Sequence, residues 1–568
     1  MSVNKIVSVE DAVGAIPNGA VLAAAGFVGN GTPEEVLIAL EKSFLERQRP
    51  RDLTLLFSSG LGDAKDRGLN RLAHPGLLKR VIAGHYGLMP KIGRMALDNA
   101  FAAYNLPQGI LTNLYRAVAG RSPGVFSKVG LGTFADPRIE GGKVNSKAID
   151  DLIECVSLNG EEYLFMKSFP INVAIIRATT ADPHGNLTME KEVLTLDTLD
   201  MALAVRASGG IVIAQVERIA ETGTLNSRLV KVPGILVDYV VVARPENHMQ
   251  TYATHYSPVF SGEIRAPIGS ITPLPFDERK VIARRAALEL SRRAIINLGI
   301  GVPEGVAAVA QEESILDQII MTVEPGIIGG IPAGGLDFGA SVNAEAVIGM
   351  PDQFNFYDGG GLDLACLGMA ECDAFGNVNS SRFNNRLAGC GGFINISQNA
   401  RTVLFVGTMT AGGLEVAVKD NKLRIIQEGK VRKFVSQVQQ ITFSGAFGST
   451  SGQKILYLTE RCVFELRHGK LHLIEVAPGI DIEREILAQM DFRPEISSVK
   501  EMDVAIFTNA PMGIRHRMSS LPRKSDRITT SSRSYPQVQE PLFQKPDRKL
   551  PVHVSSVIEP CITNAMCQ

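Results

Sequence analysis

The feature that most constrains the fold of this chain is a motif that occurs once in each half of the sequence. An apolar run leads into Gly-x-Gly-x-Pro-Glu, and a helical pattern follows. The first copy of the motif spans Gly29–Glu34 and the second spans Gly299–Glu304. A strand that turns through glycines into a helix is typical of α/β proteins with parallel sheets.

Two further segments repeat in the same order. Ala174–Asn186 aligns without gaps on Ala365–Asn377, and Gly209–Gln215 matches Gly391–Gln398 with one residue inserted. The first half is 79 residues longer between the glycine motif and the second match. Three matches in one order are hard to obtain by chance, so we expect two homologous open α/β domains in one chain.

The boundaries of these domains follow from composition. We expect an N-terminal domain over 1–262 and a C-terminal domain over 277–514. Between them, Gly262–Asp277 contains three prolines and two glycines, which is typical of a linker. Residues 515–568 carry nine Lys or Arg against four Asp or Glu, together with six prolines, so we expect a disordered basic tail.

Composition excludes several classes of function. The chain has 568 residues, of which 58 are basic and 59 acidic, so no overall field favours nucleic acid or a membrane surface. No apolar run approaches the roughly 20 residues that span a bilayer, and the first residues lack a secretory pattern. Seven cysteines form no CxxC pair, and the nine histidines show no metal spacing. We therefore expect a cytoplasmic protein with reduced thiols and no metal.

The glycine motifs suit the start of a helix. Glycine permits positive φ and close approach of a ligand, and proline fits the first helical turn. Thr32 and Glu35 predict a capping box over Pro33. The free N–H groups could bind an anion, or the turns could simply bring strand and helix together. Neither turn is a dinucleotide fingerprint, because Pro303 and Glu304 stand where a third glycine is needed.

One glutamate has no counterpart in the other half. Glu324 directly follows the predicted apolar strand Leu316–Val323, whereas Phe57–Gly60 stands at the corresponding point of the first half. Ligands of open α/β sheets bind at the carboxyl ends of the strands. Glu324 is therefore a candidate for chemistry, the alternative being a local cap or salt bridge.

At these residues the chain resembles the family I coenzyme A transferases. Asn18–Pro33 is similar to the first signature of the family, with Ala25 in place of a glycine. Val323–Gly326 resembles the second signature, but reads Val-Glu-Pro-Gly where the 3-oxoacid branch has Ser-Glu-Asn-Gly. The run Phe356–Asp363 and the segment Gly376–Asn379 look like the acetate/propionate branch.

The resemblance implies a role for each matching residue. Glu324 takes the place of the nucleophile, and Gln108 that of a side-chain contact to the oxyanion. Gly391 or Gly392 matches the backbone N–H donor of the same oxyanion hole. The CoA contacts implied are the loop of Gly299, Ile300, Gly301, Val302 and Pro303, together with Gly360 and Asn377 near the thioester or pantetheine.

The implied activity is transfer of CoA between short-chain acyl-CoA and free carboxylic acids. It would proceed by ping-pong through a glutamyl-CoA thioester, with CoA as substrate, no tightly bound cofactor, and a homodimer or homotetramer. A 3-oxoacid CoA-transferase, an acyl-CoA hydrolase and a non-catalytic scaffold with the same fold are the alternatives. A sugar-phosphate isomerase is possible by fold analogy alone.

Overall fold

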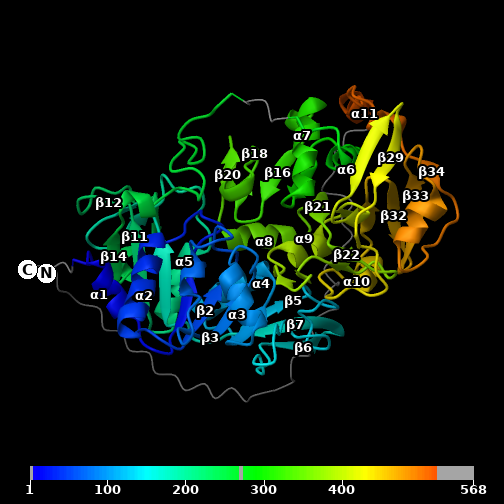
Figure 1. Cartoon of the computed structure of the whole chain (residues 1–568). Helices are drawn as coiled ribbons and strands as arrows, with labels where there is room; N and C mark the ends of the chain where they lie inside the picture. The colour runs from blue at the N-terminus through cyan, green and yellow to red at the C-terminus, as the bar shows by residue number, and fades with distance from the viewer. Residues whose placement is uncertain (1–3, 268–272, 521–568) are drawn as a thin grey trace, which may run out of the picture. The chain divides into compact units, whose positions relative to one another are not determined.

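Two large β-sheets, each drawn entirely from one half of the chain, organise the structure (Figure 1). The computed structural model describes residues 4–267 and 273–520. The N-terminal sheet has seven parallel strands. In spatial order they are β14 (Tyr239–Val242), β11 (Ile211–Val216), β8 (Val173–Arg177), β1 (Val21–Ala24), β2 (Leu53–Phe57), β3 (Leu78–Ala83) and β4 (Ala102–Asn105).

The C-terminal sheet has ten strands, with a parallel centre and antiparallel pairs on both sides. In spatial order they are β20 (Ala346–Val347), β17 (Ile327–Ile328), β16 (Ile320–Val323), β15 (Ile295–Leu298), β21 (Leu364–Gly368), β26 (Thr402–Val406), β31 (Lys454–Leu458), β32 (Cys462–Arg467), β33 (Lys470–Val476) and β34 (Lys500–Glu501).

The repeated segments occupy equivalent places in the two sheets. The order β14-β11-β8-β1-β2 in the first corresponds to β31-β26-β21-β15-β16 in the second. The 79 additional residues of the first half form β3 and β4 at the sheet edge and a small antiparallel sheet of β5 (Gly124–Ser127), β6 (Ile153–Leu158) and β7 (Glu161–Lys167). The predicted fold class, two homologous α/β domains, is confirmed.

The segments that match without gaps, Ala174–Asn186 and Ala365–Asn377, end in the same type of turn. Asp182 accepts hydrogen bonds from the backbone N–H groups two and four residues ahead, and Asp373 does the same. The other carboxylate oxygen accepts from the side-chain amide of Asn186 at 2.8 Å, or of Asn377 at 3.0 Å. The repeated Asp and Asn are therefore needed to close the turn.

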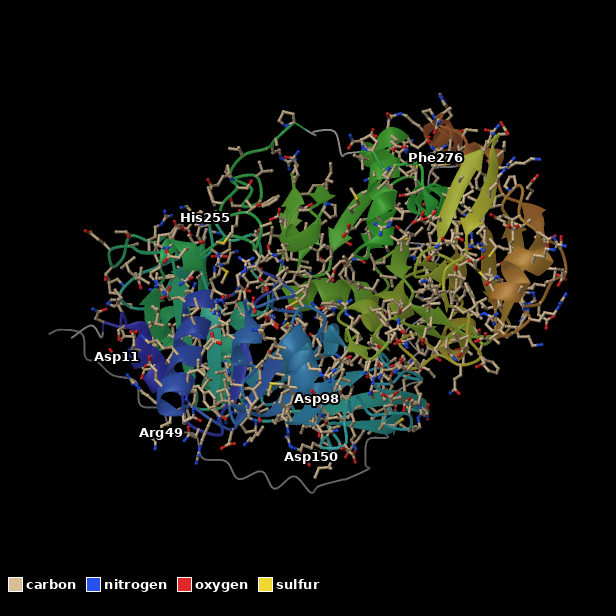
Figure 2. All side chains as sticks on the ribbon, viewed as in Figure 1. Asp11, Arg49, Asp98, Asp150, His255 and Phe276 are labelled. Atoms are coloured by element: carbon tan, nitrogen blue, oxygen red, sulfur yellow. The ribbon has the colours of Figure 1, made fainter. Side chains whose placement is uncertain are left out.

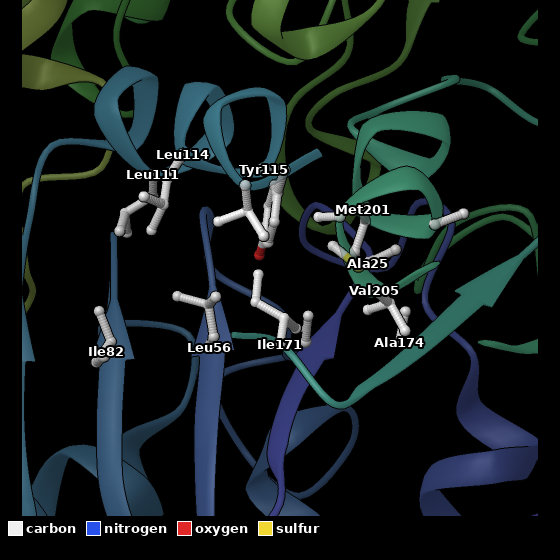
Figure 3. Packing of buried hydrophobic residues seen from close by; sticks show 14 of the residues in the cluster. Ala25, Leu56, Ile82, Leu111, Leu114, Tyr115, Ile171, Ala174, Met201 and Val205 are labelled. Atoms are coloured by element: carbon white, nitrogen blue, oxygen red, sulfur yellow. The ribbon is translucent and has the colours of Figure 1, made fainter. Parts of the chain in front are cut away.

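Helices cover these sheets, and the buried apolar side chains form several separate clusters. Figure 3 shows Leu111, Leu114 and Tyr115 of one helix facing Leu56 and Ile82 of the strands. Charged residues such as Asp11, Arg49, Asp98 and Asp150 are exposed (Figure 2). The main helices are α1 (Val9–Gly14), α2 (Glu34–Arg47), α3 (Pro90–Leu97), α4 (Gln108–Ala119), α5 (Thr198–Ala207), α6 (Glu278–Ala287), α7 (Gly305–Glu312), α8 (Met350–Asp358), α9 (Phe393–Asn399) and α10 (Gly445–Thr450).

Two local predictions are wrong. The strand before Glu324 begins at Ile320 rather than Leu316, because Leu316–Gln318 forms a 3₁₀ turn instead. The capping box does not form, because Glu35 binds Arg244 and Asn247 rather than reaching back to the start of the helix. A long-range ion pair thus replaces the local hydrogen bond that the sequence pattern favours.

The structure tests the predicted domain and tail boundaries only in part. Residues 1–521 form one compact unit, so the division into 1–262 and 277–514 stays a prediction, which the two separate sheets support. Helix α11 (Ile514–Ser520) covers the first residues of the expected tail, and the rest of 515–568 lies outside the described residues. Within the described ranges, no helix is long and apolar enough to cross a membrane.

Candidate active site

Glu324 lies at the carboxyl end of a central strand, as predicted. It directly follows β16, and the turn closes when the N–H of Gly326 donates to the carbonyl of Val323 at 3.1 Å. Gly326 has φ +129°, which favours glycine, and a side chain there would collide with Ile348. The Glu324 side chain is half-buried, and burial raises the pKa of its carboxyl to about 7.

Polar side chains that sequence reasoning missed lie beside this glutamate. Asn297, on the neighbouring strand β15, partly lowers the pKa of the Glu324 carboxyl, and its side-chain amide donates to the Thr322 carbonyl at 3.3 Å. The Tyr357 hydroxyl donates to the Thr322 hydroxyl at 2.8 Å, and that hydroxyl donates to the backbone of β15 at 2.9 Å. The available signal was an asparagine inside the apolar segment Ala294–Leu298.

Helix α8 connects the glutamate turn to the other half of the chain. The carbonyl of Gly326 accepts the N–H of Ile348 at 2.9 Å, two residues before Met350 begins α8. The Met350 sulfur then accepts the side-chain amide of Gln108 at 3.1 Å. Gln108 starts α4 and is almost completely buried. A thioether is a weak acceptor, so a substrate oxygen would be a better partner for this amide.

Gln108 and the two predicted glycines lie together. The N–H of Gln108 donates to the carbonyl of Gly391 at 3.0 Å, across the two halves of the chain. The N–H of Gly391 donates to the carbonyl of Gly84 at 2.7 Å and is therefore occupied. Within the part of the chain that the structure describes, the N–H of Gly392 has no such partner. Gly392 is thus the free donor of the pair.

The predicted CoA loop borders a pocket of about 410 Å³. The loop Gly299–Pro303 follows β15 and turns at Gly301. The φ of Gly301 is +88°, a backbone conformation that favours glycine. Ile300, Val302 and Pro303 line the pocket, together with residues after β21 and β26. The pocket thus lies at the carboxyl ends of three parallel strands. Asn297 lies on one of them, β15, whereas Glu324 follows the next strand, β16, and does not line the pocket.

A lysine in this pocket was also missed. Lys433 lines the pocket and makes no salt bridge with any described residue. Burial lowers the pKa of its ammonium to about 8, and the charge of Glu460 offsets this only partly. A cation with no partner in an apolar pocket is suited to a negatively charged ligand. The position of Lys433 in the sequence, relative to the other motifs, does not indicate that it lines this pocket.

Two predicted CoA contacts lie outside this pocket and make structural contacts, so their role toward CoA stays a prediction. Gly360 follows Gly359, the C-cap of α8, and lies before β21, at the opposite end of that strand from the pocket. The Asn377 amide donates to Asp373, and its oxygen accepts the N–H of Gly445 at 3.0 Å. Asn186 makes the same two kinds of contact in the other half. Neither Gly360 nor Asn377 lines the pocket.

Other reactive groups contribute little. Cys390 is buried beside the glycines, and burial raises the pKa of its thiol, so it stays protonated. Among residues 4–267 and 273–520, no group of three or more His, Cys, Asp or Glu side chains is arranged to hold a metal ion. The half-buried glutamate is therefore the strongest candidate for a nucleophile in the described region.

Comparison with known proteins agrees with this geometry. The coenzyme A transferase family matches residues 6–243. Caffeate CoA-transferase of Acetobacterium woodii is 47% identical over 89% of this chain and 97% of that protein, and acetate CoA-transferase YdiF of Escherichia coli is 44% identical over 89% and 96%. The crystal structure of acyl-CoA transferase YdiF superposes with a TM-score of 0.86 at 42% identity, covering 90% of this chain and 98% of that one.

An α/β fold with a glutamate at a strand end and an adjoining glycine loop defines a class of acyl-transfer enzyme. The chain belongs to the coenzyme A transferase family, and it is a CoA-transferase.

Proposed function

We propose that this enzyme transfers CoA between short-chain acyl-CoA and free carboxylic acids, with Glu324 as nucleophile. One observation carries the proposal. Glu324 lies half-buried at the end of β16, which pairs with β15, the strand that carries Asn297 and leads into the Gly299–Pro303 loop and its pocket. A second YdiF structure is described as a thioester complex with CoA, which supports CoA as a substrate of this chain.

The reaction splits a slow exchange into covalent steps. The Glu324 carboxylate attacks the acyl-CoA carbonyl, forming a mixed anhydride and expelling CoA thiolate. The thiolate attacks the glutamyl carbonyl, forming glutamyl-CoA thioester and releasing the first acid as carboxylate. A second carboxylate then attacks the thioester, and the steps run in reverse to give the new acyl-CoA. No proton or electron is gained or lost over the cycle.

Each step passes through a tetrahedral oxyanion. The Gln108 side-chain amide and the N–H of Gly392 are the donors that we assign to it, and one such donor is worth roughly 2.7–4 kcal/mol of the barrier. Lys433 and the Gly299–Pro303 loop would hold CoA itself. Binding energy from that distant end of the substrate can be used to strain the thioester.

The choice of acid and the assembly of the enzyme are also proposals. Relatives named for caffeate and for acetate have similar identity to this chain, so an acceptor panel of acetate, propionate, butyrate, lactate, acetoacetate, succinate and caffeate is needed. We propose a cytoplasmic homodimer or homotetramer without a bound metal or tightly bound cofactor, in keeping with the reduced cysteines.

The nucleophile is tested by trapping. We expect the purified enzyme, mixed with acetyl-CoA, to gain the mass of CoA less one water on the peptide that contains Glu324. Glu324→Asp retracts the carboxylate by one methylene and is expected to lower kcat by about 10²-fold, because misplacement by an ångström has costs of that order. Full activity in this variant would contradict the assignment. CoA release without any added acid would indicate hydrolysis instead of transfer.

The side-chain donor is tested separately. Gln108→Ala removes the amide that faces Met350, and we expect kcat to fall by about 10²–10³-fold with folding intact. Steady-state kinetics and the melting temperature are measured on the same preparation. An unchanged kcat removes Gln108 from the site. Asn113→Ala is the matched control, since Asn113 lies on the same helix but faces Asn355.

A further inference from the structure

One histidine that the mechanism does not yet use is held against the proposed oxyanion site. His85 follows β3 at its carboxyl end. The N–H groups of Tyr86 and Gly87 both donate to the carbonyl of Ala388, at 2.7 and 2.8 Å. Gly84 accepts the N–H of Gly391. We call the contact between segments 84–87 and 388–391 the seam, and His85 lies within it.

The His85 ring occupies a hollow lined by glycines. A Cβ atom on Gly60 would lie 2.7 Å from His85 Nδ1, and one on Gly87 would lie 2.9 Å from His85 Cε1. A Cβ atom on Gly391 would lie 3.7 Å from both His85 Cδ2 and Gln108 Oε1. His85 and Gln108 therefore flank the same face of Gly391, the residue before the free N–H of Gly392.

The two ring nitrogens of His85 differ. Nδ1 is buried and has no hydrogen-bond partner among the described residues. The side chain as a whole is only half-buried, and Nε2 is not one of its buried, unpartnered atoms. Burial, with the nearby charge of Arg386 as a smaller cause, lowers the pKa of the ring to about 4, so it is neutral at pH 7. An enclosed N–H without an acceptor costs more than an enclosed lone pair. The single proton therefore belongs on Nε2, which is left as a donor.

We propose that His85 is a third hydrogen-bond donor to the acyl oxygen, acting with Gln108 and the N–H of Gly392. This inference rests on the proposed function. Nε2–H donates to the oxygen as it becomes negative in each tetrahedral intermediate, and the proton stays on Nε2. No covalent bond forms or breaks at the ring. A neutral donor stabilises the oxyanion without protonating the CoA thiolate that must attack next.

Three variants and one control test the donor. His85→Ala removes the ring, His85→Phe fills the glycine hollow without a donor, and His85→Gln restores an N–H. His472→Ala is the matched control, because His472 is also half-buried with an enclosed, unpartnered Nδ1 but lies on β33. We expect kcat to fall about 10²-fold in the Ala and Phe variants, to stay within tenfold of wild type in the Gln variant, and to be unchanged in His472→Ala.

A role in packing alone predicts a different result. If His85→Phe keeps kcat within a few-fold of wild type, or if folded His85→Gln is as slow as His85→Phe, the inference is overturned. Melting temperatures identify any variant that fails to fold. If the Ala variant fails to fold, the Phe variant still decides the test.

A single-turnover experiment separates this inference from the proposed function. Each protein is mixed with acetyl-CoA, and the CoA adduct on the Glu324 peptide is followed by mass spectrometry. If wild type forms no adduct, the proposed function itself fails. If wild type forms it and His85→Phe forms it equally fast, only the role of His85 is refuted. We expect the adduct to form about 10²-fold more slowly in His85→Phe.

Discussion

At the scale of single residues, the environment of Glu324 sets its reactivity. Burial holds the pKa of its carboxyl at about 7, while the adjacent backbone and the side chain of Asn297 offset that rise in part. A carboxylate that is poorly solvated is a better nucleophile than one in water, but it must first be ionised. The enzyme thus keeps a charged group where charge is unfavourable, at some expense in folding free energy.

This conflict predicts a pH-dependent difference in stability. Above the unfolded pKa near 4.5, the unfolded chain releases the Glu324 proton while the folded protein retains it up to about pH 7. The contribution of Glu324 to the free energy of unfolding therefore falls as pH rises through this window. We expect Glu324→Gln to melt at a higher temperature than wild type at pH 8, with a smaller difference at pH 5.

Thermal unfolding followed by circular dichroism at both pH values checks this expectation. Glu345→Gln is the control, because the Glu345 side chain is exposed, and its melting temperature should follow that of wild type. A Glu324→Gln protein that is equally or less stable than wild type at pH 8 would show that burial does not strain this carboxylate.

At the scale of elements, the repeated turn at Asp182 and Asp373 separates architecture from chemistry. The Asn186 oxygen accepts the N–H of Gly234 at 2.8 Å, just as the Asn377 oxygen accepts that of Gly445. Each asparagine thus joins its own turn to one distant backbone segment. Because the same contacts occur in both halves and only one half carries Glu324, we expect these shared contacts to serve folding.

The pair of asparagines therefore provides its own control. Asn186→Ala and Asn377→Ala each leave a backbone N–H without its acceptor, and we expect each to lower the free energy of unfolding by about 1–3 kcal/mol. KM for CoA should be unchanged in both. Urea titration and steady-state kinetics measure the two quantities. A raised KM in Asn377→Ala alone would restore Asn377 as a CoA contact.

Repetition explains how much of this molecule could be predicted. The halves, the sheets and the position of Glu324 follow from ordered matches and strand ends, because these depend on local sequence. The occupied N–H of Gly391, the pocket lysine Lys433 and the ring of His85 could not be found in that way. Each depends on which distant loops converge, and a sequence read without relatives gives no distances between loops.

At the scale of the whole molecule, the candidate active site lies where the two halves of the chain meet. Asn395 on α9 accepts the N–H of Gly109 at 3.1 Å, directly beside Gln108, and donates to both oxygens of Asp358 at 3.0 and 3.1 Å. Gln398 makes a second such bridge, to Gly130 at 2.7 Å. Packing between the halves therefore positions the donor Gln108 relative to the glutamate turn.

Removing one of these bridges should affect stability and catalysis together. Asn395→Ala leaves the Gly109 N–H unsatisfied and Asp358 with fewer donors, so we expect a loss of about 2–3 kcal/mol in stability and a lower kcat. Asn399→Ala is the control, because Asn399 also donates to Asp358, at 3.3 Å, but has no bond to α4. If both variants keep wild-type kcat, the interface does not position Gln108.

The crossing hydrogen bonds at the seam have a consequence for how such an enzyme can be encoded. Alignment of the reacting groups depends on surfaces that recognise each other, so we expect it not to require a covalent link between the two halves. Two separately translated polypeptides carrying the same surfaces would reconstitute one catalytic centre, at a concentration-dependent rate. Fusion into a single open reading frame makes their stoichiometry one to one and removes that dependence.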